Sequence, residues 1–300
     1  MIALMALSIG GGTVVEHLGA SALVYAPNAG HPPAPAEDRP PIEVVVPGLQ
    51  TTALRVDVGP PRASLSLWVM SRGAPRATVF VLHGIRDQKG SMVGWGERLT
   101  AMGYRAVLVD SRGHGRSSGD FLSYGVVEAR DLSQALDALV AQGQVVGRVG
   151  AMGVSYGAST AIEWAGAEPR VAAVVAVAPF QSLRAVVPGY VSRFVPVVGG
   201  LVPDFLIGRA IARAGRTGGF DPEASPLEAI GHTRAPVLLI HGRADTHIDP
   251  SHSEALHARA LDHSELVLVD DEDHETITRD RTGVLWTRAA DWLHRALDPG

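Results

Sequence analysis

The sequence predicts an α/β fold in which a mostly parallel β-sheet carries helices on both faces. From residue 78 to residue 297, short apolar runs rich in β-branched residues alternate with amphipathic helical stretches, which is the pattern of a parallel sheet covered on two sides. One apolar run ends in a Gly-x-Ser-x-Gly turn at residues 153–157 and passes directly into a helical stretch. Acidic and histidine residues follow two later strands, at the edge where open α/β sheets place their sites.

The predicted elements begin with a hairpin-like pair of strands. The remaining elements alternate along the chain. The strands are expected at Thr52–Val58, Ala63–Met70, Thr78–Leu82, Arg105–Asp110, Val145–Val154, Val171–Ala178, Pro236–His241 and Glu265–Val269, and the helices at Met92–Met102, Val126–Val140, Ala158–Ala167, Ser253–Leu261 and Val284–Leu297. In the second helix, Leu132, Ala135, Leu136, Leu139 and Val140 are expected on one buried face.

Composition excludes several classes of function. The chain of 300 residues is 46% hydrophobic, which is ample for the core of one large domain, expected over residues 50–297. A net charge of -5 gives no basic surface, so nucleic acid is not an expected partner. The absence of cysteine excludes disulfides and thiol catalysis. The 12 histidines show no metal-ligand spacing, and we expect neither a metal nor a cofactor.

The N-terminal region is divided into a hydrophobic segment, residues 1–28, and a Pro-rich linker, residues 29–49. Met1–Val15 is uncharged but shorter than the roughly 20 residues of a membrane span, and no positive residue precedes it as in a signal peptide. The Pro-rich spacer favours an anchor or export signal, and hence a membrane-anchored or exported protein that associates with the membrane through this segment. The alternative is a helix packed on the domain of a cytoplasmic protein.

Ser155 is the candidate nucleophile because it occupies the sharp turn between a strand and a helix. Side chains two residues before and two after this serine would collide with neighbouring backbone, and Gly153 and Gly157 remove them. A serine hydroxyl needs a base and a carboxylate that orients the base. Asp245 and His274 follow successive strands, and the order Ser, Asp, His is one of the known orders of such triads.

Other residues compete for these roles. Asp249 is the alternative acid, although a carboxylate just after the strand is easier to hold rigidly. His252, His257 and His263 lie on or beside a predicted helix and are expected at the solvated surface, whereas His274 lies in the loop after the last strand. The acidic residues before His274 are either surface charge or close enough to stabilise a charged imidazole.

A tetrahedral intermediate also needs backbone donors, which we assign to the amides of Ile85 and Tyr156. His83 is expected to be structural. The residues Asp110, Arg112 and His114 are expected to fix a second tight loop at the same sheet edge.

These motifs together resemble those of the α/β-hydrolase-fold serine hydrolases. The resemblance covers about residues 50–297 and is carried by His83-Gly84-Ile85, Asp110-Ser111-Arg112-Gly113-His114-Gly115, Gly153-Val154-Ser155-Tyr156-Gly157, His241-Gly242-Arg243-Ala244-Asp245 and Asp273-His274. Residues 178–183 are similar to a stretch of bacterial esterase-like hydrolases that often carry an N-terminal hydrophobic segment. The resemblance implies the fold but leaves the substrate open.

An insertion at about residues 181–233 separates the strand after the nucleophile helix from the next strand. Insertions of this length are usually functional lids, and this one is largely apolar. We expect a small helical cap over an acyl pocket. The alternatives are plain packing against the domain and a lid that contacts lipid.

The leading interpretation is therefore a serine hydrolase of carboxylesterase type that cleaves esters with short or medium acyl chains through an acyl-enzyme. A peptidase, an amidase or an acyltransferase could use the same residues. A ligand-binding protein without catalysis is the third interpretation. The expected partner is a small ester, and the sequence does not define the oligomeric state.

Overall fold

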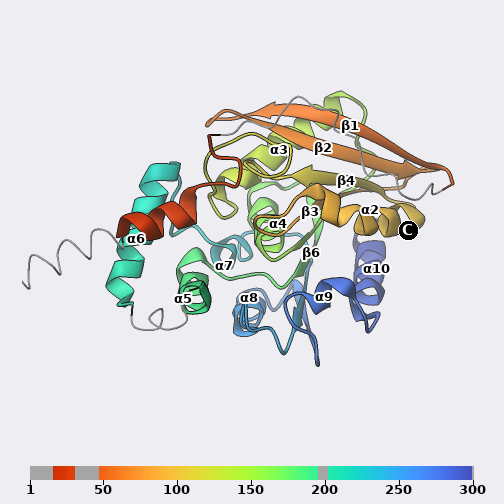
Figure 1. The fold of residues 1–300 in the computed structure, drawn as a ribbon. Coiled ribbons are helices and arrows are strands. Elements are labelled where there is room, and N and C mark those ends of the chain that lie inside the picture. Colours follow the sequence, from red (N-terminus) through yellow and green to blue (C-terminus); the bar gives the residue numbers. More distant parts are fainter. Residues whose placement is uncertain (1–15, 31–46, 195–201, 299–300) are drawn as a thin grey trace, which may run out of the picture.

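The computed structural model describes residues 16–30, 47–194 and 202–298 (Figure 1). Residues 1–15 of the hydrophobic segment, 31–46 of the Pro-rich linker and 195–201 of the predicted cap lie outside these ranges. Within them, no helix is both long enough and apolar enough to cross a membrane.

The centre of the molecule is an eight-stranded sheet with the order β1-β2-β4-β3-β5-β6-β7-β8. Strand β2 runs antiparallel to β1 and β4, and the other neighbouring pairs are parallel. The strands are β1 (Leu49–Val58), β2 (Ala63–Arg72), β3 (Thr78–Leu82), β4 (Arg105–Asp110), β5 (Val149–Val154), β6 (Val171–Val177), β7 (Val237–Gly242) and β8 (Ser264–Val269). The predicted hairpin and the mostly parallel sheet are confirmed.

Helices cover both faces of this sheet. They are α2 (Val93–Ala101), α3 (Val126–Ala141), α4 (Tyr156–Ala167), α5 (Leu183–Phe194), α6 (Asp204–Gly218), α7 (Pro226–Ala229), α8 (Ser251–Arg259), α9 (Thr276–Arg279) and α10 (Val284–Leu297), with a 3₁₀ helix η1 (Lys89–Met92) before α2. Strand residues alternate between two cores: Phe80 and Leu82 pack with α3, α4 and α8, and Val79 and Val81 pack with α2 and α10. The central strands are therefore apolar on both sides.

Two local predictions were wrong. The strand expected from Val145 begins only at Val149. Gly147 has a positive φ of 60°, and the backbone N–H and carbonyl groups of Val146 bond to the Thr78 hydroxyl and not to the backbone of a neighbouring strand. Val140 was expected on the buried face of α3, but its side chain is 52% exposed because it lies in the last turn of the helix.

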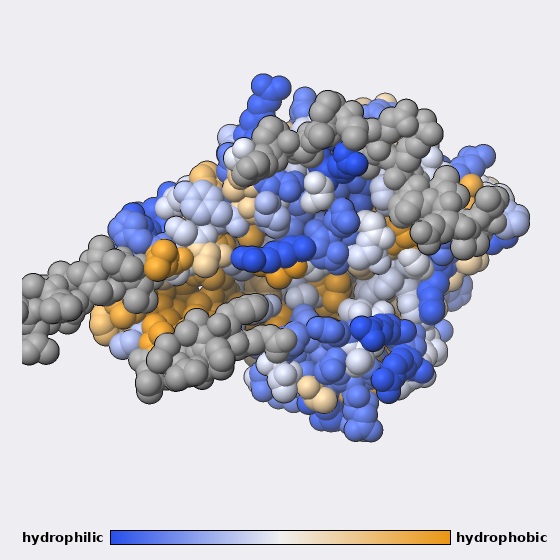
Figure 2. All heavy atoms as spheres, viewed as in Figure 1, coloured by the Kyte–Doolittle hydropathy of each residue, from blue (hydrophilic) through white to orange (hydrophobic). Residues whose placement is uncertain are grey.

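The cap consists of α5, α6 and α7, inserted between β6 and β7 as predicted. A helix at residues 16–24 lies beside α6 (red in Figure 1). Ala20 and Val24 are buried against the cap, and Glu16 accepts a hydrogen bond from Arg209 of α6 at 2.8 Å. The described part of the hydrophobic segment 1–28 is thus packed on the domain. Figure 2 shows apolar side chains gathered over the part of this face where α5 and α6 lie.

Candidate active site

Ser155 lies between β5 and α4 in a backbone conformation that few residues adopt, with φ 53° and ψ -116°. The flanking glycines allow this conformation. A Cβ on Gly153 would lie 2.4 Å from the backbone of Gly157, and a Cβ on Gly157 would lie 2.4 Å from the carbonyl oxygen of Leu82. The two glycines are therefore required by close backbone contacts, as the sequence predicted.

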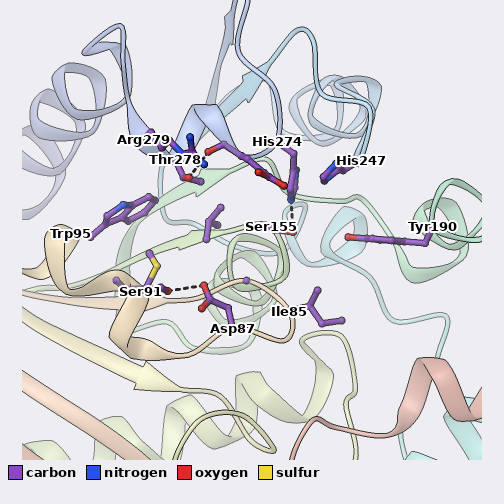
Figure 3. Close-up of a pocket in the computed structure, with 14 residues that line it drawn as sticks. Ile85, Asp87, Ser91, Trp95, Ser155, Tyr190, His247, His274, Thr278 and Arg279 are labelled. Atoms are coloured by element: carbon purple, nitrogen blue, oxygen red, sulfur yellow. Dashed lines mark hydrogen bonds between the residues drawn. The ribbon is translucent and has the colours of Figure 1, made fainter. Parts of the chain in front are cut away.

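A chain of hydrogen bonds joins Ser155, His274 and Asp245, and Figure 3 shows the contact between Ser155 and His274. His274 Nε2 lies 3.1 Å from Ser155 Oγ, and His274 Nδ1 lies 2.7 Å from Asp245 Oδ2. Ser155 follows β5, Asp245 lies in the loop after β7, and His274 lies in the loop after β8. The parallel strands thus bring three residues that are distant in sequence to one edge of the sheet.

Asp245 is buried, and several donors surround its carboxylate. Burial alone would raise the pKa of this carboxyl, but hydrogen bonds from His241 and His274 hold the pKa well below its usual range. The backbone N–H groups of His247 and Ile248 donate to Oδ1 at 2.8 Å and 2.9 Å. The carboxylate is therefore fixed in its charged form, which is the form that can stabilise an imidazolium.

The two residues predicted to supply the oxyanion amides are Tyr156, which follows Ser155 in the chain, and Ile85, which lines the same cavity. Tyr156 is the first residue of α4, where backbone N–H groups are not used within the helix. Its side chain is turned away, since the hydroxyl donates to Glu128 Oε1 at 2.8 Å. Ile85 lines the cavity at Ser155, and a Cβ on the preceding Gly84 would lie 3.9 Å from Ser155 Cβ.

A cavity of about 630 Å³ opens at Ser155. In Figure 3, Ile85, Tyr190 and His247 lie on one side of Ser155, and Trp95, Ser91, Thr278 and Arg279 lie on the other. Tyr190 comes from α5 and brings the cap into contact with the cavity. The cavity therefore extends away from the serine in two directions, as a site for a two-part substrate requires.

Buried polar contacts hold the loops beneath this site. His83 Nε2 accepts a hydrogen bond from Ser111 N–H at 3.1 Å, and burial lowers the His83 pKa, so the ring is structural as predicted. The Asp110 carboxylate accepts from Lys89 Nζ at 2.7 Å and from Arg116 N–H at 2.8 Å.

The other two residues of the predicted tight loop are also buried in polar contacts. Arg112 forms a two-pronged ion pair with Asp131 at 2.6 Å and 2.7 Å. His114 Nδ1 lies 3.0 Å from the carbonyl oxygen of Arg112. Asp110, Arg112 and His114 therefore fix this loop.

The competing candidates lie elsewhere. Asp249 accepts a hydrogen bond from the Ser251 N–H at 2.9 Å, at the start of α8, and does not hold His274. His252 was expected at the surface, but it is buried because its Nδ1 accepts a hydrogen bond from the backbone N–H of Gln181. His257 and His263 bond to Ser264 Oγ and the Ile230 carbonyl, respectively.

The acidic residues before His274 have separate roles. Asp270 pairs with Arg243 at 2.7 Å, and Asp273 accepts hydrogen bonds from the backbone N–H groups of Glu275 and Thr276 at the start of α9. Glu272 is buried under the loop that carries Asp245. Asp273 therefore helps to fix the turn that carries His274.

Sequence reasoning did not single out several residues that line the cavity, Asp87 and His247 among them. The His247 ring centroid lies 5.1 Å from that of His274. His247 and Asp87 each lie two residues beyond a predicted site residue, Asp245 and Ile85, so their place in loops at the carboxyl ends of strands was the available signal. Within the described ranges, no group of three or more His, Asp or Glu side chains could hold a metal ion.

Residues 73–225, more than half of the chain, match the family model described as serine aminopeptidase, S33. Among curated proteins, the uncharacterized protein YqkD of Bacillus subtilis is 28% identical over 209 residues, which cover 66% of this chain and 64% of that protein. The uncharacterized protein YfhR of Escherichia coli is 25% identical, with 74% of this chain and 72% of that protein covered. The match thus spans less than two thirds of the length of YqkD.

Solved structures share the fold. The Pyrococcus furiosus esterase Pf2001 matches with a TM-score of 0.66 and 22% identity, covering 82% of this chain and 93% of that chain. The Pyrococcus horikoshii acylaminoacyl peptidase matches with a TM-score of 0.62 and 17% identity, covering 85% of this chain and 43% of that chain. The sheet order, the turn at Ser155 and the inserted cap are those of the α/β-hydrolase fold.

Proposed function

Because this chain belongs to the serine aminopeptidase, S33 family of α/β-hydrolase-fold enzymes, we propose that it is a serine hydrolase that cleaves carboxylic esters with short or medium acyl chains. The observation that carries this proposal is the hydrogen-bond chain from Asp245 through His274 to Ser155, with Ser155 in contact with the cavity. The structural similarity to an esterase of Pyrococcus furiosus supports the ester as the substrate class.

The first half-reaction forms an acyl-enzyme. Ser155 Oγ attacks the acyl carbonyl carbon while its proton passes to His274 Nε2. The amides of Ile85 and Tyr156 donate to the oxyanion, and Asp245 stabilises the imidazolium. The carbon–oxygen bond to the alcohol then breaks, and the alcohol leaves with the proton from His274.

The second half-reaction releases the acid. His274 takes a proton from water, and the hydroxide oxygen attacks the acyl carbon. The bond from this carbon to Ser155 Oγ then breaks, and Ser155 Oγ receives the proton that His274 returns. The acyl chain is expected on the side of Ile85 and Tyr190, because both side chains belong to the apolar cluster that includes the cap. No cofactor is required for either step.

Amide cleavage by the same residues is the second candidate. The family description and the similarity to an acylaminoacyl peptidase favour it, although neither fixes the leaving group.

The test is hydrolysis of p-nitrophenyl esters from acetate to laurate, beside the matched p-nitroanilides, with Ser155→Ala as the control. Turnover of short or medium esters that disappears in Ser155→Ala is expected. Faster cleavage of the anilides would establish the peptidase, and equal turnover by wild type and Ser155→Ala would refute both functions.

A further inference from the structure

The cavity has a second end that the acyl chain does not explain. Trp95 of α2 lines this end together with Asp87 and Ser91, and Thr278 and Arg279 line it from α9 (Figure 3). Trp95 is buried and forms a T-shaped pair with Trp286, with ring centroids 5.6 Å apart. This packing fixes the Trp95 side chain as a wall of the cavity at this end. This end therefore combines an aromatic surface with charged side chains.

His274 determines which part of the substrate reaches this end. The imidazole that accepts the serine proton also protonates the leaving alcohol, so the alcohol oxygen must lie beside His274 Nε2. Thr278 and Arg279 follow His274 on the same segment and line the cavity on the side away from Tyr190 of the cap (Figure 3). The alcohol is thus directed toward Trp95 and Asp87, while the acyl chain lies toward Tyr190.

Two hydrogen bonds fix the position of the Asp87 carboxylate. Its Oδ1 accepts a hydrogen bond from Gln88 N–H at 2.8 Å, and its Oδ2 accepts one from Ser91 Oγ at 2.6 Å (Figure 3). A carboxylate oxygen can accept two hydrogen bonds, so each oxygen has capacity for another donor. The loop is anchored by Lys89, whose backbone N–H and Nζ both bind the buried Asp110.

We propose that this end of the cavity binds the leaving alcohol and that Asp87, beside the Trp95 wall, selects an alcohol that carries a cationic nitrogen. This inference rests on the proposed function, since it names the alcohol half of that ester. A carboxylate and an indole face both attract a cation. Apart from its two histidines, the cavity as a whole is lined by two carboxylates, Asp87 and Glu275, and one guanidinium, Arg279, so negative charge predominates.

The experiment measures binding without turnover, in a Ser155→Ala background. Butyrylcholine is compared with 3,3-dimethylbutyl butyrate, which has nearly the same shape but a carbon in place of the charged nitrogen. Calorimetric titration is expected to give roughly tenfold tighter binding of butyrylcholine, with a preference that declines as salt is added. Asp87→Asn is expected to reduce that preference to about twofold or less.

Two further variants separate the local charge from general effects. Arg279→Gln removes the cation at this end and is expected to tighten butyrylcholine binding about twofold. Asp262→Asn, at an exposed carboxylate before β8, is expected to change neither affinity. Equal binding of the two esters, or a preference that persists in Asp87→Asn, would overturn the proposal. Failure of the wild type to hydrolyse p-nitrophenyl butyrate would instead refute the proposed function.

Discussion

His274 Nε2 lies 3.1 Å from Ser155 Oγ, although the two residues are 119 positions apart in the chain. Strand β5 and the turn after it fix the serine, and the loop after β8 fixes the histidine. Because the same parallel sheet holds both residues, substitutions that shift its strands or the loops after them are expected to lower activity and stability together.

The turn at Ser155 should not tolerate a side chain at Gly157. In Gly157→Ala, the new Cβ would lie 2.4 Å from the Leu82 carbonyl oxygen, so the backbone must shift and hydrolase activity should fall at least about a hundredfold. Gly94→Ala is the matched control, because its Cβ meets nothing within 4 Å in helix α2. The control should gain about 0.5–1 kcal/mol in stability. Similar activity in both variants would contradict the close contact.

Asp245 should make stability depend on pH in acid. Its folded-state pKa is depressed, so its contribution to stability is present above the unfolded-state pKa of about 3.9 and is lost as the pH falls through the folded-state value. The difference in unfolding free energy between wild type and Asp245→Asn should therefore be largest above about pH 5 and shrink steadily as the pH falls below about pH 4. Urea titrations across this range test it; a difference that does not vary with pH would contradict it.

Glu163 should produce the opposite dependence, a loss of stability as the pH rises toward about 8. Burial, followed by the negative charges of Glu228 and Glu128, raises the pKa of Glu163 to about 8. The contribution is complete below the unfolded-state pKa of about 4.3 and is lost as the pH rises through about 8. The melting temperature of the wild type should decline from about pH 5 to pH 8 and level off above that, and that of Glu163→Gln should decline less. Parallel profiles would show that Glu163 is not involved.

Lys89, the only lysine in the chain, should be essential for stability. Its Nζ lies 2.7 Å from Asp110 Oδ2 and 4.5 Å from the centre of the Trp68 ring, and both ionic side chains are buried. Lys89→Met leaves the Asp110 carboxylate buried without its cation and should cost about 3–5 kcal/mol of unfolding free energy. Arg243→Met, at the exposed pair with Asp270, should cost less than about 1 kcal/mol. Equal losses would show that burial does not distinguish the two pairs.

The helix at residues 16–24 should stabilise the cap. Val24 is buried with α6, and Val24→Ala should cost about 1–3 kcal/mol in denaturant titrations. Leu18 is 67% exposed on the same helix, and Leu18→Ala should change stability by less than about 0.5 kcal/mol. Equal effects at the two positions would mean that this helix is not packed on the domain in solution.

The sequence was sufficient for the elements whose patterns are local. The apolar strands, the glycines around Ser155 and the order of Ser155, Asp245 and His274 are all visible as residue types at fixed spacing. The start of β5 was missed because Thr78, far away in the sequence, binds the backbone of Val146. No local sequence pattern indicates a contact between residues so far apart in the chain.

Burial of polar residues was equally hidden. From the sequence alone, Lys89 and His252 are expected at the surface. In the structure, Lys89 bonds to the buried Asp110, and the His252 ring accepts a hydrogen bond from Gln181. The cavity residues Asp87, Tyr190 and His247 come from three separate elements, so they become a group only when the loops and the cap converge. Those groupings depend on tertiary structure and cannot be obtained from spacing alone.

The most direct test of the catalytic centre is the mass of the intact protein after treatment with a fluorophosphonate. One phosphonyl group should attach to Ser155 in the wild type, with fluoride leaving, and none should attach in Ser155→Ala. Asp245→Asn should react much more slowly, because His274 loses the carboxylate that orients it. No adduct on the wild type, or an adduct that persists in Ser155→Ala, would contradict the assignment of Ser155 as the nucleophile.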